Sequence, residues 1–358
     1  MVDRLFDGNE TFLIWGAGRW GRLLYEFYPD LPVKAFIDND IDKQNSEVNG
    51  KKILSFEEAV ATYPDSLIVI AIQRVNRPRA LLSSRGLVER KDFFPIYDFI
   101  PLYAWHTKKQ LRTTIMQLAP NNTCTQKCEG CITYVPYAQT KVIRPLEELK
   151  RDVDLAFANI NKTMMVCSSS GEPFLHPQIV DFWEYISENY AVKYHQLLVV
   201  TNSTIQPSDD AFRRLSKLNK VIFSLSNYSD MLPKQGENLR AMIDKLETYG
   251  IKYFLNTSSD KEDWNDCGDP RIKQEIASEA LQKRYKDCTK TPCGVYDGKF
   301  FFCMQEAWAN LSTGTPIYED DYYDFESDTD LSKLRSIVLR QPEKGYLEFC
   351  SHCVGRIN

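Results

Sequence analysis

The chain has 358 residues, of which 43% are hydrophobic and 26% are charged, and its net charge is −5. These values are typical of a globular protein with two or more domains. The mixed charge excludes the basic surface of a nucleic-acid-binding protein, and the absence of a long apolar run excludes a membrane-spanning helix. The first residues lack the basic start and the cleavage site of a signal peptide, so we expect a cytoplasmic protein.

The N-terminal third alternates between strand and helix patterns. Residues 11–15 (TFLIW) are predicted to form a buried strand, which the glycine-rich stretch GAGRWG and a helix follow, and further strands are predicted at 33–38 and 66–72. This alternation indicates a doubly wound α/β unit. Because the pattern stops after about three strands, we expect a half-Rossmann domain over residues 1–105. Residues 89–106 are rich in aromatics and proline and are predicted to be a connector.

GAGRWG matches the G-x-G-x-x-G pattern of dinucleotide-binding folds. Gly16, Gly18 and Gly21 lie between the first strand and the helix, and Asp38 ends the second strand. The N-terminus of the helix would bind a phosphate. The stretch also resembles small Rossmann-like domains beside sugar-modifying enzymes, including nucleotide-sugar acyltransferases. The alternatives are therefore a nucleotide ligand, a nucleotide-bearing substrate, and a purely structural or dimerising role.

A second series of strands and helices occupies residues 106–257. Four helices are predicted between its strands, at residues 144–160, 176–190, 208–218 and 236–250. The strands themselves are predicted at residues 113–119, 163–169, 195–202, 220–226 and 251–256. Strand–helix pairs in this number predict a partial (β/α) barrel, in which chemistry gathers at the carboxyl ends of the strands.

All ten cysteines follow residue 123, and three of them lie just after the first strand of this series. Cys124, Cys128 and Cys131 form the pattern C-x3-C-x2-C. Three thiolates can hold three irons of a cubane cluster, which leaves the fourth iron open for a substrate or cofactor. Zinc is the alternative, but it would need a fourth ligand, and the nearest histidines, His106 and His176, lie outside the loop.

This loop resembles the signature of the radical S-adenosylmethionine (SAM) superfamily. The resemblance implies a partial (β/α)6 TIM-type barrel with a [4Fe–4S] cluster on the three cysteines. It also implies SAM-binding residues at the ends of the next three strands. Ser170 stands where the family has a glycine. For Ser224 and Ser226 the alternative is ordinary polarity at a strand end. These SAM-binding residues are Ser170, Gly171, Glu172, Pro173, Thr201, Asn202, Ser224 and Ser226.

The resemblance further implies the chemistry. The amino and carboxylate groups of SAM chelate the open iron, and one electron from the reduced cluster cleaves SAM to a 5′-deoxyadenosyl radical. That radical removes a hydrogen atom from an unactivated C–H bond, while the protein supplies placement and a dry site. A flavodoxin- or ferredoxin-type partner would supply the electron.

A second group of cysteines lies in residues 258–358. Cys288 and Cys303 flank Gly298 in the pattern C-x9-G-x4-C, and Cys350 and Cys353 follow as C-x2-C. This arrangement resembles the auxiliary-cluster segment of enzymes with twitch or SPASM extensions, in which the glycine turns a β-hairpin. It implies a second [4Fe–4S] cluster, held by four thiolates and suited to electron transfer. The alternatives are Cys293 in place of Cys288, and a structural zinc.

Two further interpretations complete the sequence analysis. Cys267 is a candidate hydrogen donor to a product radical, with an ordinary loop thiol as the alternative. We expect a radical SAM oxidoreductase of dehydrogenase or epimerase type that acts on a sugar, a cyclitol or a nucleotide-linked sugar. The alternatives are peptide modification and a zinc-binding, nucleotide-sensing interaction protein.

Overall fold

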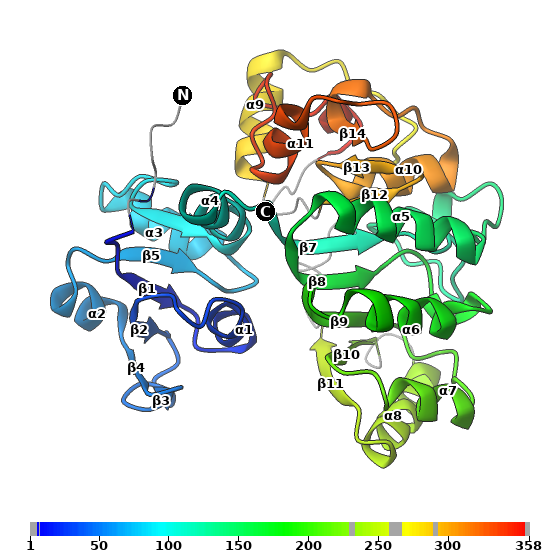
Figure 1. Cartoon of the computed structure of the whole chain (residues 1–358), viewed down its shortest axis with the longest axis horizontal. Coiled ribbons are helices and arrows are strands. Elements are labelled where there is room, and N and C mark those ends of the chain that lie inside the picture. Colours follow the sequence, from blue (N-terminus) through cyan, green and yellow to red (C-terminus); the bar gives the residue numbers. More distant parts are fainter. Residues whose placement is uncertain (1–5, 7, 229–232, 258–266, 289–292, 355–358) are drawn as a thin grey trace. The chain divides into compact units, whose positions relative to one another are not determined.

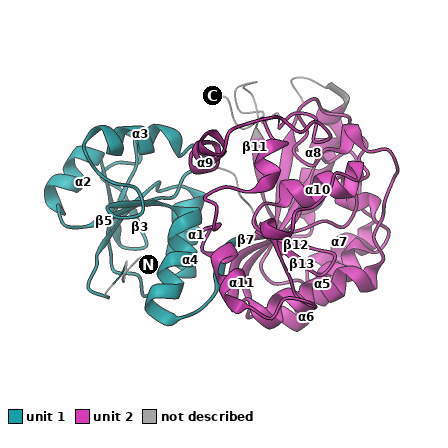
Figure 2. Cartoon of the chain, turned by 90° about the horizontal axis from the view of Figure 1, so that it is seen from above, with its two compact units in different colours: residues 1–114 teal, residues 115–358 magenta. Residues whose placement is uncertain are grey.

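The computed structural model describes residues 6, 8–228, 233–257, 267–288 and 293–354. The chain divides into two compact units, residues 1–114 (unit 1) and residues 115–358 (unit 2), which Figure 2 distinguishes by colour. Each unit is an α/β fold around a largely parallel sheet (Figure 1), so the predicted fold class is confirmed. The finer division into three domains stays a prediction. None of the helices in the described ranges has the length and hydrophobicity needed to cross a bilayer.

Unit 1 contains a sheet in the order β3-β4-β2-β1-β5-β6. Its pairings are parallel except the one between β3 and β4. The strands are β1 (Phe12–Trp15), β2 (Val33–Ile37), β3 (Glu47–Val48), β4 (Lys51–Leu54), β5 (Leu67–Ile70) and β6 (Phe93–Pro95). The helices are α1 (Arg19–Phe27), α2 (Phe56–Thr62), α3 (Asn76–Ser84) and α4 (Ile96–Lys108).

This sheet is wider than the three strands expected from the sequence. The additional parallel strands β4 and β6 are only four and three residues long, too short to show a period. Residues 89–106, predicted to be a connector, contain β6 and most of α4, whose helical pattern is obscured by the internal Pro101. Counted along the chain, the five parallel strands lie in the order 3-2-1-4-5, which is that of a dinucleotide-binding fold without its last strand.

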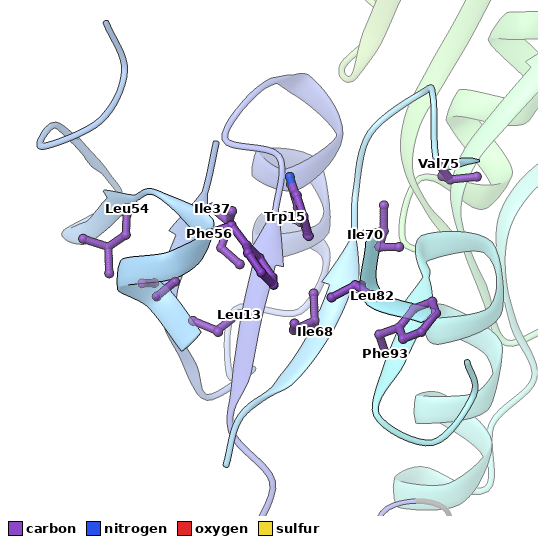
Figure 3. Close-up of a cluster of buried hydrophobic side chains, with 12 residues drawn as sticks. Leu13, Trp15, Ile37, Leu54, Phe56, Ile68, Ile70, Val75, Leu82 and Phe93 are labelled. Carbon is purple, nitrogen blue, oxygen red and sulfur yellow. The ribbon is translucent and has the colours of Figure 1, made fainter. Parts of the chain in front are cut away.

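One face of this sheet packs in a hydrophobic cluster (Figure 3). Alternate residues of each strand, such as Leu13 and Trp15 of β1, point to this face because side chains alternate along a strand. Phe56 of α2 stacks on Trp15 with ring centroids 4.8 Å apart. This packing fixes the strand ends from which the glycine-rich turn departs.

Unit 2 contains a sheet in the order β11-β10-β9-β8-β7-β12-β13-β14. The strands are β7 (Arg112–Leu118), β8 (Lys162–Ser168), β9 (Tyr194–Thr201), β10 (Val221–Asn227), β11 (Lys252–Thr257), β12 (Cys293–Tyr296), β13 (Lys299–Phe301) and β14 (Tyr322–Asp324). The helices are α5 (Leu146–Asn159), α6 (Ile179–Tyr190), α7 (Asp209–Leu215), α8 (Pro233–Thr248), α9 (Ser278–Asp287), α10 (Met304–Thr313) and α11 (Leu331–Val338).

The five strands predicted for the barrel are present as β7 to β11. The next parallel strand, β12, pairs with β7 and not with β11. It then forms an antiparallel hairpin with β13 through Asp297 and Gly298, whose φ angles are +50° and +70°. Positive φ at both positions fits a two-residue hairpin turn, so the predicted turn is confirmed. The hairpin therefore lies beside the strand that leads into the first cysteine loop.

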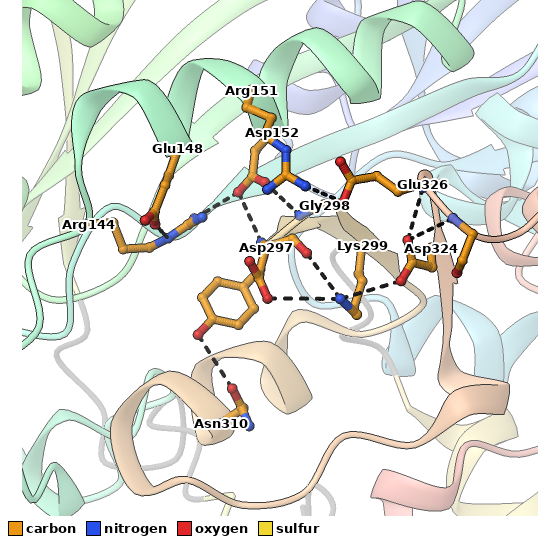
Figure 4. Close-up of polar contacts among 12 residues, drawn as sticks. Arg144, Glu148, Arg151, Asp152, Asp297, Gly298, Lys299, Asn310, Asp324 and Glu326 are labelled. Atoms are coloured by element: carbon orange, nitrogen blue, oxygen red, sulfur yellow. Dashed lines mark hydrogen bonds and ion pairs between the residues drawn. The ribbon is translucent and has the colours of Figure 1, made fainter.

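A buried carboxylate anchors this hairpin to α5 (Figure 4). Asp152 forms an ion pair with Arg144 at 2.8 Å, and both side chains are almost fully buried. The same carboxylate accepts hydrogen bonds from the backbone N–H groups of Gly298 (2.8 Å) and Asp297 (3.2 Å). The Asp152 carboxylate thus accepts the hydrogen bonds of the turn and also neutralises the Arg144 guanidinium.

We expect Asp152→Asn to destabilise unit 2 by about 3 kcal/mol, because it leaves the buried Arg144 without its counter-charge. Urea unfolding followed by circular dichroism measures this loss. Glu326→Gln is the control, because Glu326 pairs with Arg151 on the surface and exposed pairs contribute about 0.5 kcal/mol or less. Equal stability losses in the two variants would contradict the anchoring role.

Candidate active site

The loop after β7 is held in place by a buried asparagine. The Asn122 amide group donates to the carbonyl oxygens of Thr140 and Leu311, each at 3.0 Å, and its oxygen accepts from Val142 N–H at 2.7 Å. Leu311 belongs to α10, which follows the β12–β13 hairpin. The two ends of the cysteine loop and the C-terminal segment are therefore joined through one side chain.

The three thiols of this loop are half-buried and lie close to one another. Cys124 Sγ accepts from Gln126 N–H at 3.4 Å, and Cys128 Sγ donates to the Gln126 side-chain oxygen at 3.3 Å. Cys131 Sγ lies 3.4 Å from the hydroxyl of Thr133. Burial raises the pKa of Cys128 to about 11, and the neighbouring thiolates of Cys131 and Cys124 raise it further in the same direction. Three thiolates in this loop would repel one another, and a cationic metal centre would neutralise their negative charge.

The segment after β8 packs tightly on the cysteine loop at Gly171. Its φ angle is +63°, and a Cβ atom there would collide with the Thr123 carbonyl oxygen and the Asn121 side-chain oxygen. Glu172 N–H donates to the same Thr123 carbonyl at 2.7 Å, and the Asn121 amide donates to the Glu172 carbonyl at 3.3 Å. Only glycine allows this approach of two backbones. The preceding Ser170 is almost fully buried.

The carboxylate of Glu172 joins the ends of β8 and β9. It accepts hydrogen bonds from the Thr201 hydroxyl (2.8 Å) and the Asn202 backbone N–H (2.9 Å). Pro173 begins a 3-10 turn (Pro173–Leu175), whose Phe174 N–H also faces the carboxylate at 3.4 Å. Burial raises the pKa of Glu172 to about 7, although these donors oppose the increase. The group therefore titrates near neutral pH.

Asn202 connects the end of β9 to the first cysteine. Its amide donates to Cys124 Sγ at 3.3 Å. Gln235 of α8 donates to the carbonyl oxygens of Asn202 (2.7 Å) and Ser226 (2.8 Å), so it joins the ends of β9 and β10. Ser203 has a φ angle of +62°, a conformation that favours glycine.

The end of β10 completes this edge of the sheet. Ser224 is buried and pairs with Val200 of β9 and Phe254 of β11, whereas Ser226 lies nearer the strand end and is partly exposed. Two residues further on, burial raises the pKa of Tyr228 to about 12, and the three loop cysteines also raise it, while a hydrogen bond with Ser226 lowers it. Tyr228 therefore lies near the cysteines, a placement that the sequence analysis missed.

The second cysteine group also gathers in unit 2. Burial raises the pKa of Cys303 well above its usual value, and the nearby thiolates of Cys288, Cys350 and Cys353 contribute in the same direction. Cys350 is raised by burial and then by Cys288, Asp321 and Cys353. Cys288, Cys350 and Cys353 therefore lie within electrostatic range of Cys303, although the four cysteines come from three separate segments.

Two other cysteines have different surroundings. Cys293 lies on β12 and donates to the carbonyl oxygen of Ile115 at 3.3 Å. Cys267 is buried in a hydrophobic cluster that also contains Tyr134 and Trp308. Within the described ranges, no group of three histidine, cysteine or carboxylate side chains is arranged to hold a metal ion. Residues 258–266, which precede Cys267, lie outside the described residues.

In unit 1 the glycines of GAGRWG differ in their surroundings. A Cβ atom on Gly16 or Gly21 would collide with neighbouring backbone, whereas one on Gly18 would meet nothing within 4 Å. Asp38 accepts a hydrogen bond from Ala17 N–H at 3.0 Å, so it faces the glycine-rich turn from the end of β2. Close packing thus explains why glycine is needed at positions 16 and 21, whereas the space beside Gly18 is unfilled.

The profile of the radical SAM superfamily matches residues 118–258. These residues are a radical SAM domain. The match begins at the last residue of β7 and ends just after β11, so it contains the cysteine loop and the strand ends described above. No protein of curated function matches the chain.

Solved structures of radical SAM proteins resemble the chain at low identity. BtrN in complex with AdoMet and 2-DOIA is 14% identical, with a TM-score of 0.39, over 68% of this chain and 93% of that chain. The AdoMet-bound anSMEcpe is 12% identical, with a TM-score of 0.42, over 65% and 81%. HydG, a maturase of the [FeFe]-hydrogenase, is 17% identical, with a TM-score of 0.32, and the match spans 44% of this chain and 38% of HydG.

A radical SAM domain uses SAM and a [4Fe–4S] cluster, and the residues at this edge fit both. Three thiols lie on one loop without a fourth cysteine in it, which suits a cluster with one open iron. The buried hydroxyls of Ser170 and Ser203 have no hydrogen-bond partner among the described residues. Unsatisfied buried hydroxyls are rare, and a polar ligand at these strand ends would satisfy both of them.

We expect Gly171→Ala to lose SAM binding, because the new methyl group forces the segment after β8 away from the cysteine loop. Isothermal titration of the anaerobic, iron-loaded protein with SAM measures this loss. Gly314→Ala is the matched control: Gly314 has a similar φ angle of +70° but nothing within 4 Å of a Cβ atom. The control should cost about 1–2 kcal/mol of stability from its backbone conformation alone and keep SAM binding. Normal SAM affinity in Gly171→Ala would contradict this account.

The residues that hold the site together were missed by the sequence analysis. Asn121, Asn122 and Gln235 carry the hydrogen bonds between the loop and its neighbours. The only local signal was the polar pair before the first cysteine, in APNNTC, because two buried asparagines after an apolar strand need partners. Gln235 has no local signal, since its two acceptors come from different strands.

Proposed function

We propose that the chain is a radical SAM oxidoreductase that removes a hydrogen atom from an alcohol carbon of a sugar-like substrate and passes one electron to an auxiliary cluster. The observation that carries the proposal is the second cysteine group, formed by Cys288, Cys303, Cys350 and Cys353 in the same unit as the radical SAM loop. The cofactors would supply 5′-deoxyadenosyl radical formation at the first centre and acceptance of one electron at the second.

The residues at the carboxyl ends of the strands would bind and orient SAM. Cys124, Cys128 and Cys131 would hold the first cluster, and the buried hydroxyl of Ser170 is available to a polar group of SAM. Glu172 already accepts hydrogen bonds from Thr201 and Asn202, so its role is to hold the ends of β8 and β9 together. A cationic ammonium nearby would favour its ionised form at neutral pH.

Oxidation accounts for a second centre with four thiolates. Loss of a hydrogen atom from a C–OH carbon leaves a radical that must lose one more electron and the hydroxyl proton to become a carbonyl. A cluster with four protein ligands has no open iron for substrate, which suits it to electron transfer. Cys303 is buried and the other three cysteines are half-buried, and burial limits access of solvent to the centre.

The features of unit 1 support a sugar-like substrate, in particular a nucleotide-linked sugar. Its strand order is that of a dinucleotide-binding fold, and its first turn carries Gly16, Gly18 and Gly21 with Asp38 opposite. The open space at Gly18 leaves the backbone of the turn accessible to a phosphate.

The test uses anaerobic, iron-reconstituted protein with SAM, dithionite and a panel of deuterated sugars, cyclitols and nucleotide-linked sugars. Deuterium should move from one substrate class into 5′-deoxyadenosine, with formation of the corresponding carbonyl compound. Transfer from peptides and from no sugar would show peptide modification instead. Colourless protein that contains zinc would overturn the proposal and support an interaction protein.

A further inference from the structure

The Asn202 side chain lies between the end of β9 and the first cysteine of the radical SAM loop. It is only 8% exposed, and its amide nitrogen donates to Cys124 Sγ at 3.3 Å. The two residues are 78 positions apart in the sequence, so this hydrogen bond is a tertiary contact. A buried carboxamide is therefore directed at a thiol of the cysteine loop.

Contacts on the other side of Asn202 decide which end of its amide faces the sulfur. The Thr204 backbone N–H donates to Asn202 Oδ1 at 2.9 Å. Because a backbone N–H can only donate, this oxygen is the acceptor, and the NH₂ group is left to face Cys124. The backbone of Asn202 is also fixed, since its N–H donates to the Glu172 carboxylate and its carbonyl oxygen accepts from Gln235 at 2.7 Å. Protein contacts thus hold the donor at the sulfur.

Cys124 differs from the next cysteine of the loop in its hydrogen bonds. Its sulfur accepts the Gln126 backbone N–H at 3.4 Å in addition to the Asn202 amide. The Cys128 thiol, by contrast, donates to the Gln126 side-chain oxygen at 3.3 Å. Two N–H donors therefore converge on the sulfur of Cys124, as they would on a thiolate that ligates a metal centre.

The neighbouring Ser203 shows what a residue available to a ligand looks like at this strand end. Its buried hydroxyl has no hydrogen-bond partner among the described residues, so a polar ligand can bind it. Both ends of the Asn202 amide, in contrast, are occupied, the oxygen by Thr204 and the nitrogen by Cys124. The sequence resemblance assigned Asn202 to SAM, whereas its contacts favour a role at the cluster.

We propose that the Asn202 amide donates a hydrogen bond to the Cys124 sulfur of the first cluster and thereby raises the reduction potential of that cluster. The inference rests on Cys124 as a ligand of the first cluster, and it is independent of the auxiliary cluster and of the substrate. An N–H dipole directed at a ligating sulfur stabilises the additional negative charge of the reduced cluster. Asn202 thus sets how readily the cluster accepts the electron that SAM cleavage requires.

The test uses the anaerobic, iron-reconstituted full chain without SAM. Redox titration followed by electron paramagnetic resonance (EPR) gives the potential, and the part of the signal that Cys128→Ser lacks belongs to the first cluster. Asn202→Ala should shift this potential to a more negative value, because the donor is lost. Asn202→Asp should shift it further, because a carboxylate adds negative charge beside the sulfur. Asn159→Ala is the control and should leave the potential unchanged, since the Asn159 amide donates to the Leu155 carbonyl oxygen within α5.

A second measurement detects the hydrogen bond without a variant. Wild-type protein that carries ¹⁵N in the side-chain amides of asparagine should show a ¹⁵N coupling to the reduced first cluster in pulsed EPR. The coupling arises because an N–H···S hydrogen bond transfers some spin density to nitrogen. If Asn202→Ala fails to take up iron, this coupling decides: its presence in the wild type supports the inference, and its absence overturns it.

The alternative is that Asn202 binds SAM, as the resemblance implies. Asn202→Ala would then weaken SAM binding in isothermal titration but leave the potential of the SAM-free cluster unchanged, and the inference would be overturned. If the wild type holds no cluster that Cys128→Ser removes, the assignment of the first cluster fails together with the inference. The predicted shifts in potential, in a protein that oxidises no sugar, would support the inference and overturn only the proposed function.

Discussion

Replacing Cys128 by serine should abolish SAM cleavage and remove about four of about eight irons in the reconstituted protein. Cys128 is the middle member of the C-x3-C-x2-C loop, and its thiol lies within electrostatic range of Cys124 and Cys131. Two thiolates and a hydroxyl cannot hold a cubane by three of its irons, so the open iron that chelates SAM is lost. Iron analysis and chromatography of 5′-deoxyadenosine after reduction measure both effects.

The control for this variant is Cys293→Ser. The Cys293 thiol donates to the Ile115 carbonyl oxygen, and a serine hydroxyl can keep that hydrogen bond. We expect this variant to retain its full iron content and SAM cleavage. Full 5′-deoxyadenosine formation in Cys128→Ser would contradict the assignment of the first cluster.

Replacing Cys288 by serine should remove about four irons while SAM cleavage continues. Because the radical SAM loop is intact, the reduced protein should still form 5′-deoxyadenosine. The substrate radical would lack its electron acceptor, so formation of the oxidised product should fall to the background level. The measurement is the ratio of oxidised product to 5′-deoxyadenosine. Mössbauer spectroscopy identifies the remaining cluster.

Cys293→Ser again provides the comparison, since it lies five residues from Cys288 and was the alternative ligand in the sequence pattern. The electrostatic grouping of Cys288 with Cys303 and Cys350 supports Cys288. Loss of the second cluster in Cys293→Ser, with retention in Cys288→Ser, would reverse the assignment. Retention in both would point to a different fourth ligand, for which Cys267 is a candidate because it lies in the buried cluster against which Cys353 packs.

Local patterns predicted the parts of the site that a short segment can specify. The cysteine loop was recognised by its spacing, and Gly171 and Thr201 were named from the family resemblance at the ends of predicted strands. The hairpin turn at Asp297 and Gly298 was likewise a two-residue signal. The radical SAM domain is the part of the chain in which such signals are densest.

Contacts between distant segments could not be predicted in this way. The hydrogen bond from Asn122 to Leu311 joins residues 189 positions apart, and Gln235 joins two strand ends from a helix. The width of the sheet in unit 1 was missed because β4 and β6 are too short to display a period. The role of Asp152 depends on a hairpin that begins more than a hundred residues later.

The central claim is that Cys124, Cys128 and Cys131 hold a cluster with one iron open to SAM. EPR spectroscopy of the anaerobic, dithionite-reduced protein, recorded with and without SAM, tests it most directly. The account predicts the signal of a reduced [4Fe–4S] cluster that changes when SAM is added and disappears in Cys128→Ser. A signal that is indifferent to SAM, or that persists unchanged in Cys128→Ser, would contradict it.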